Sequence, residues 1–112
     1  MLKKIQINKP GSYDTLQLIE QDIPQVAANQ VLIEVKACGV NYADSIVRMG
    51  LYASAKELHG YPITPGFEIA GIVSHVGSEV KNFKSGDEVL ALTLFGGYCS
   101  HIVLSEDRVF NK

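Results

Sequence analysis

The sequence predicts a mainly β fold, a small barrel or sandwich with one or two short helices. Several alternating or continuous apolar runs are each bounded by Gly, Ser, Asn or Asp, as short strands are. Only one segment combines the apolar spacing and the end signals of a helix. A chain of 112 residues has room for one core, so we expect a single domain over residues 1–112.

The predicted strands follow one another with turn residues between them. Gln30–Lys36 is the clearest, because Val31, Ile33 and Val35 alternate with residues of mixed polarity and so form one apolar face. Further runs of this kind are Thr15–Ile23, Ile69–Val76, Glu88–Leu94 and Tyr98–Leu104. Such a series of short strands favours a sandwich or a barrel.

One helix of about two turns is predicted from Asn41 to Met49. Asn41 is an N-cap candidate, Asp44 lies three residues later, and Gly50 supplies a stop. The next residues, Leu51–Pro65, have little periodicity and predict a long loop, with a turn of helix around residues 53–58.

Composition excludes several classes of partner. The chain has 10 Lys and Arg against 12 Asp and Glu, for a net charge of −2, and no basic block, which argues against nucleic acid or an anionic membrane as the main partner. No apolar run is long enough for a signal peptide or a transmembrane helix. Cys38 and Cys99 are far apart and form no C-x-x-C motif, so we expect two buried, unpaired thiols and a cytoplasmic protein.

Common catalytic motifs are missing from the sequence. It has no G-x-G-x-x-G or P-loop motif to hold a pyrophosphate, and no G-x-S-x-G serine nucleophile. His59, His75 and His101 are too widely spaced to share one helix face or strand, so the sequence predicts no metal site.

Two glycine-containing segments carry a family resemblance. The first is A-C-G-V-N-Y-A-D, residues 37–44, followed by R-M-G-L-Y at 48–52. The second is P-G-x-E-x-x-G-x-V-x-x-V-G, residues 65–77, with G-D-x-V beginning at Gly86. Taken alone, these glycines are explained by bends between strands. Together the segments resemble the medium-chain dehydrogenase/reductase superfamily, and specifically its N-terminal GroES-like domain, a β-barrel, from about Lys3 to Lys112.

Substitutions within the motifs indicate the branch of that superfamily. Its zinc alcohol dehydrogenases have a Cys ligand where this chain has Asn41, a His ligand at Phe67, and a hydroxyl residue at Ala43. An amide is a poor zinc donor and a phenyl ring is none. The four-cysteine lobe of structural zinc is also missing after Thr93. The chain instead resembles the zinc-free quinone oxidoreductases, the zeta-crystallin-like branch, which implies that it binds no zinc.

The resemblance also implies what these residues do. It implies NADPH-dependent reduction of a small quinone or enone in a cleft shared with a Rossmann domain, which this chain lacks. Asn41 and Tyr52 would be the catalytic residues, because an amide and a neutral phenol both offer hydrogen bonds to a carbonyl. The residues lining the cofactor would be Asn41, Tyr42, Ile46 and Phe67. Several family members have a tyrosine at the position of Ile46.

Alternative interpretations remain open at this point. Asn41 is equally well explained as a helix N-cap, and Asp44 and Glu68 are better explained as structural carboxylates than as an acid/base pair. The chain could be a stand-alone GroES-like binding or assembly module, or a fragment of a zinc alcohol dehydrogenase. As an enzyme domain it should fold but show no turnover by itself, and homodimers of the family depend mainly on the other domain.

Overall fold

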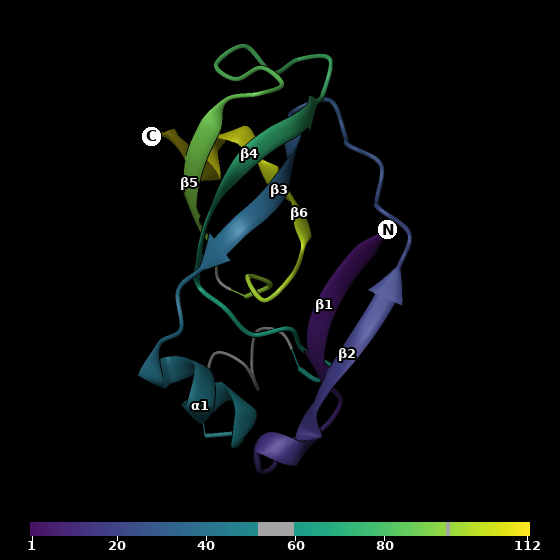
Figure 1. Ribbon diagram of the computed structural model, residues 1–112, viewed down its shortest axis with the longest axis vertical. Coiled ribbons are helices and arrows are strands. Elements are labelled where there is room, and N and C mark those ends of the chain that lie inside the picture. Colours follow the sequence, from purple (N-terminus) through teal and green to yellow (C-terminus); the bar gives the residue numbers. More distant parts are fainter. Residues whose placement is uncertain (52–59, 94) are drawn as a thin grey trace.

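The computed structural model describes residues 1–51, 60–93 and 95–112 (Figure 1). Tyr52 and the turn of helix predicted around residues 53–58 lie outside the described residues. Within the described ranges no helix is long and apolar enough to cross a membrane. The elements in chain order are β1 (Leu2–Ile7), η1 (Tyr13–Thr15), β2 (Leu16–Gln21), β3 (Gln30–Cys38), α1 (Tyr42–Arg48), β4 (Glu68–Val76), β5 (Glu88–Leu92), β6 (His101–Ser105), η3 (Glu106–Arg108) and β7 (Val109–Asn111).

A curled, antiparallel five-stranded sheet forms the body of the domain. Its strand order is β6-β3-β4-β5-β7, and it encloses a core between its strands (Figure 1). Val31 and Ile33 of the apolar face predicted for Gln30–Lys36 are fully buried, but Leu32 between them is buried as well and Val35 is half-buried, so burial along β3 does not alternate regularly. Val31 and Ile33 belong, with Val73 and Val89, to the main core cluster. The prediction of a mainly β, barrel-like fold is confirmed.

A two-stranded hairpin, β1 with β2, lies beside this sheet (Figure 1). β1 was not predicted from the sequence, because its three apolar residues among six do not alternate regularly. The strand is held by distant partners: the Lys3 N–H donates to the Ser100 Oγ 2.8 Å away, and the Ile5 N–H donates to the Tyr98 carbonyl at 2.9 Å. A strand stabilised by residues almost a hundred positions away is not visible in local pattern.

Helix α1 covers the end of the fold below the sheet (Figure 1). It buries Val47 completely against Ile7, Ile63 and Phe95, which form a second core cluster. Asn41 is its N-cap residue, as predicted, and the Asn41 backbone N–H donates to Asp44 Oδ2 at 2.9 Å. The helix therefore begins and ends within a residue or two of the predicted bounds.

The segment before β6 differs from the prediction. The run starting at Tyr98 was expected to be extended, but the strand begins at His101. The preceding residues form a tight turn, in which the Cys99 N–H donates to the Gly97 carbonyl, and this turn packs on Gly66. Gly66 has a φ of +112° and its Cα carries no side chain, so the backbones of the two segments touch.

The cysteine expectation is wrong for one of the two residues. Cys38 is exposed at the end of β3, and Cys99 is half-buried; both are free thiols. Cys38 is the last residue of β3 and lies beyond the residues of that strand that pair with β6, so it is outside the covered middle of the sheet. Burial raises the pKa of the Cys99 thiol to about 11.

Candidate functional site

The candidate site centres on Asn41, in the short connection between β3 and α1. Its backbone is extended, with φ −118° and ψ 154°, and its side chain is exposed. The backbone is fixed by Asp44: the Asn41 N–H donates to the carboxylate, and the Asp44 N–H donates to the Asn41 carbonyl at 3.0 Å. Asn41 is thus both a capping residue and an exposed amide.

Glu68 approaches Asn41 from the neighbouring strand. It is the first residue of β4, and its Oε1 accepts a hydrogen bond from Asn41 Nδ2 at 3.4 Å. The strands bring the two together, because Cys38 pairs with Ile69 and the Gly39 N–H donates to the Glu68 carbonyl at 3.1 Å. The two glycine-containing motifs of the sequence therefore meet at this point.

Asp44 is the buried member of the group. It is 6% exposed, and its Oδ2 also accepts a hydrogen bond from the Tyr98 hydroxyl at 2.7 Å. Its Oδ1 has no partner in the described part of the chain. Burial, with help from the Asp44 carboxylate, raises the pKa of Tyr98 above its ordinary value, so the hydroxyl stays protonated as a donor. The contacts agree with a structural role for Asp44.

The remaining predicted site residues have varied surroundings. Tyr42 is 81% exposed, and Ile46 is half-buried. Phe67 is half-buried against Phe95, with ring centroids 5.6 Å apart and planes tilted by 50°. Tyr52 lies outside the described residues. The structure therefore joins Asn41 to Glu68 and Asp44, and it does not gather the whole predicted set around one cavity.

An apolar cavity of about 550 Å³ adjoins Asn41. Glu68 and Gly39 line it, so the group that holds the Asn41 amide also forms the cavity wall. Its other lining residues come from the ends of β3 and β4, from β5 and from β7, and are Ala37, Cys38, Ile69, Ala70, Leu90, Ala91, Leu92 and Phe110. A planar, largely apolar molecule with a polar end suits such a wall.

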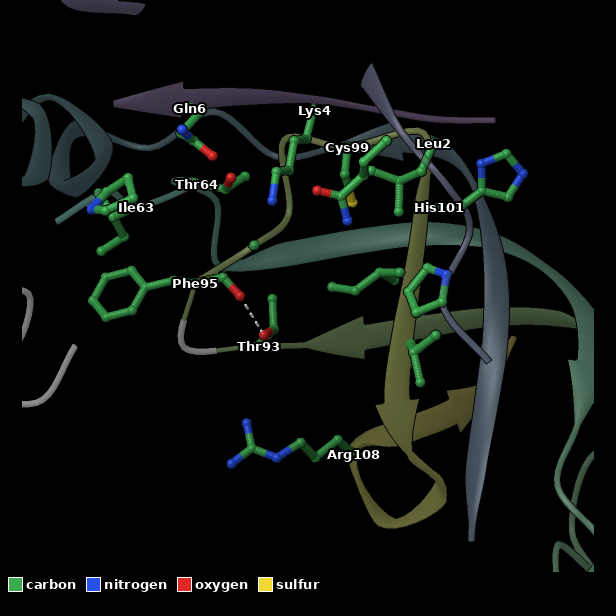
Figure 2. A pocket seen from close by; sticks show the side chains of 16 residues that line it. Leu2, Lys4, Gln6, Ile63, Thr64, Thr93, Phe95, Cys99, His101 and Arg108 are labelled. Carbon is green, nitrogen blue, oxygen red and sulfur yellow. Dashed lines mark hydrogen bonds between the residues drawn. The ribbon is translucent and has the colours of Figure 1, made fainter. Parts of the chain in front are cut away.

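A second cavity, of about 520 Å³, lies between β1 and the main sheet (Figure 2). Lys4 and Gln6 of β1 are on one side of it, and Arg108 is on the opposite side. The Thr93 hydroxyl, between them, donates to the Phe95 carbonyl at 2.7 Å. None of the predicted site residues within the described ranges lines this cavity.

Potential metal ligands are dispersed. Over residues 1–51, 60–93 and 95–112, no three His, Cys, Asp or Glu side chains come together. His75 and His101 each share a hydrogen bond of 2.9 Å with the preceding serine hydroxyl, and His59 lies outside these ranges.

Sequence reasoning missed two residues of the site. Tyr98 is 54 positions from Asp44, and no local pattern connects them. Gly39 was noted only as part of a motif, but a Cβ at this position would lie 2.1 Å from Glu68 Oε1. The available signal was that the two motifs lie at the ends of neighbouring strands, because residues at such adjoining strand ends lie side by side.

Comparison with known proteins identifies the family. The model of the alcohol dehydrogenase GroES-like domain matches residues 27–111. This chain belongs to that family. The resemblance to medium-chain dehydrogenases/reductases seen in the sequence is thereby confirmed.

Similar members of this GroES-like family include quinone oxidoreductases. The chain is 39% identical to a quinone oxidoreductase from Sus scrofa over 98% of its own length and 33% of the relative's. Quinone oxidoreductase 1 of Escherichia coli is 38% identical over 95% of the chain and 32% of the relative. The chain thus spans about a third of the curated relatives it matches.

Solved structures of this family have the same fold. The crystal structure of E. coli quinone oxidoreductase complexed with NADPH matches with a TM-score of 0.88 and 35% identity, over 97% of this chain and 32% of that one. CurK enoyl reductase matches with a TM-score of 0.90 and 33% identity, over 99% and 35% of the two chains.

Proposed function

We propose that residues 1–112 form the N-terminal catalytic domain of a cytoplasmic, NADPH-dependent quinone oxidoreductase or enone reductase that works without zinc. In this proposal a Rossmann domain completes the cleft, and any homodimer forms mainly through that domain. One observation carries the proposal: the Asn41 amide is exposed and held by Asp44 and Glu68. The family resemblance implies that this is the position of a Cys zinc ligand in the zinc alcohol dehydrogenases. Support comes from relatives that are quinone oxidoreductases and from a similar structure that contains NADPH.

The residues present fit the nicotinamide end of NADPH. Asn41 offers an N–H to a carboxamide or substrate carbonyl, and Phe67 and the apolar wall near Glu68 can exclude water from a flat ring. No phosphate-binding glycine motif occurs in the sequence, so the pyrophosphate must be held elsewhere. When bound, NADPH supplies the hydride.

Neutral hydrogen-bond donors suffice for this chemistry. A quinone or enone is already electrophilic, so its oxygen needs only hydrogen bonds as negative charge develops there. In the proposed site Asn41 and Tyr52 supply those hydrogen bonds, while Tyr42 and Ile46 line the cofactor side. The role of Tyr52 rests on its match to the family motif R-M-G-L-Y.

The test is an activity and metal measurement on the gene product that contains this chain. We expect NADPH oxidation with members of a panel of quinones and enones, loss of at least about tenfold in kcat/KM for Asn41→Ala, and less than stoichiometric zinc. The isolated 112-residue polypeptide should fold and show no turnover. Tightly bound stoichiometric zinc, or turnover by the isolated chain, would contradict the proposal.

A further inference from the structure

The oxygen and the nitrogen of the Asn41 side-chain amide each face a neighbouring group. Its oxygen side faces the N–H of Asp44 as part of a capping box, although no hydrogen bond of regular geometry joins them. Its nitrogen faces Glu68, with Asn41 Nδ2 3.4 Å from Oε1. An ionised carboxylate only accepts hydrogen bonds, so reversing the amide would set two oxygens against each other. Both contacts therefore select the same orientation of the amide.

Glu68 reaches Asn41 because Gly39 has no side chain. A Cβ on Gly39 would lie 2.1 Å from Glu68 Oε1, 2.6 Å from its Cγ and 2.7 Å from its Cδ. The Glu68 side chain therefore lies across the Gly39 Cα on its way to Asn41. The φ of Gly39 is not positive, so alanine is compatible with the backbone there, and the flexible Glu68 side chain would be the group that moves.

We infer that Glu68, seated over Gly39, is a positioning residue that fixes the Asn41 amide so that its second N–H is the hydrogen bond offered to a ligand. The group recognised by Asn41 is then an acceptor, such as the carbonyl oxygen of a quinone, an enone or a carboxamide. This inference deepens the proposed function and, for its ligand, rests on it. The distance of 3.4 Å exceeds the usual 2.7–3.2 Å range, which predicts a restraint of modest strength.

The Glu68–Asn41 contact is tested first without activity, by ¹⁵N NMR of the purified protein. The two side-chain N–H protons of Asn41 should differ in their rate of exchange with solvent, because one donates to Glu68 and the other does not. This difference should be lost in Glu68→Ala, which removes the acceptor, and in Gly39→Ala, which displaces it. The same exchange rates in wild type and both variants overturn the inference.

Kinetics then test whether the contact positions Asn41 for a ligand. We expect Glu68→Ala and Gly39→Ala each to lower kcat/KM by about three- to tenfold, and the double variant to lose no more than either one. Glu68→Gln keeps an acceptor and should stay within about twofold of wild type. Glu79→Ala, at an exposed glutamate in the turn after β4, is the matched control and should leave kcat/KM unchanged.

Failure of the positioning inference can be distinguished from failure of the proposed function. If Asn41→Ala lowers activity while Glu68→Ala and Gly39→Ala do not, the positioning inference is overturned and the proposed function stands. If the gene product reduces no quinone or enone, the proposed function fails, and the NMR exchange measurement still decides whether Glu68 orients the Asn41 amide. Equal urea midpoints for the variants and wild type exclude a merely structural effect.

Discussion

Replacing Gly66 by alanine should destabilise the domain far more than the same change at Gly86. Both glycines have positive φ, +112° and +97°, so each alanine incurs a backbone cost of about 1–2 kcal/mol. Around Gly86 a new Cβ meets nothing within 4 Å. At Gly66 it would lie 2.7 Å from the Gly97 Cα and 2.8 Å from the Tyr98 nitrogen, so the two backbones must separate.

Separation of these segments breaks hydrogen bonds. The Gly97 N–H donates to the Gly66 carbonyl at 3.1 Å, and the Tyr98 N–H donates to the Pro65 carbonyl at 2.9 Å. Their loss adds about 1 kcal/mol each, for a total of about 3–4 kcal/mol at Gly66. Tyr98 also donates its hydroxyl to Asp44, so the shift should reach the start of α1.

Urea unfolding followed by circular dichroism measures both variants. With a slope of about 1.5 kcal/mol per molar urea, the midpoint should fall by about 1 M for Gly86→Ala and by about 2 M or more for Gly66→Ala. Equal shifts in the two variants would refute the reasoning, because the close approach to Gly97 would then cost nothing.

Three further predictions concern stability. Val47→Ala removes two fully buried methyl groups and should cost about 2–3 kcal/mol in thermal unfolding, whereas Met49→Ala, at a 40% exposed residue, should cost under about 0.5 kcal/mol. Tyr98→Phe removes a donor from the buried Asp44 carboxylate and should cost about 1–3 kcal/mol; an unchanged unfolding midpoint would contradict this. Burial raises the pKa of Cys99 from 9.0 to about 11. The stability that this shift contributes is complete below pH 9 and is lost as pH rises towards 11. The urea midpoint should therefore decline less steeply over this pH range for Cys99→Ala than for wild type.

The sequence predicted those elements whose signals are local. The strand at Gln30 has an apolar face, and the helix at Asn41 has its cap and its stop within ten residues. β1 lacked such a signal, because Leu2 and Ile7 are buried at opposite ends of the strand and several of its partners are distant in the sequence, at Ile63, Tyr98 and Ser100. The extended run expected from Tyr98 failed because Gly97 and Cys99 form a turn that packs on Gly66.

The candidate site follows from the sequence motifs, whereas the contacts within it could not be predicted. The family motifs singled out Asn41 and placed Glu68 in the second motif, but only the register of β3 with β4 brings them together. The capping box agrees with the structural roles considered for these residues, which are a helix N-cap for Asn41 and a structural carboxylate for Asp44. A cap and an exposed amide are compatible in one residue, because the backbone N–H of Asn41 and the oxygen side of its amide face Asp44 while the side chain remains exposed.

The hydrogen bonds between β1 and residues near the C-terminal end of the sequence affect the order in which the chain folds. The Lys3 N–H and the Ser100 Oγ are joined across 97 positions, and the Ser100 N–H donates in turn to the Lys3 carbonyl at 2.7 Å. During synthesis β1 and its partner strand β2 therefore leave the ribosome long before Tyr98 and Ser100 are made. We expect β1 and β2 to dock late, so that a nascent chain halted before residue 98 lacks the hydrogen bonds that tie β1 to Tyr98 and Ser100.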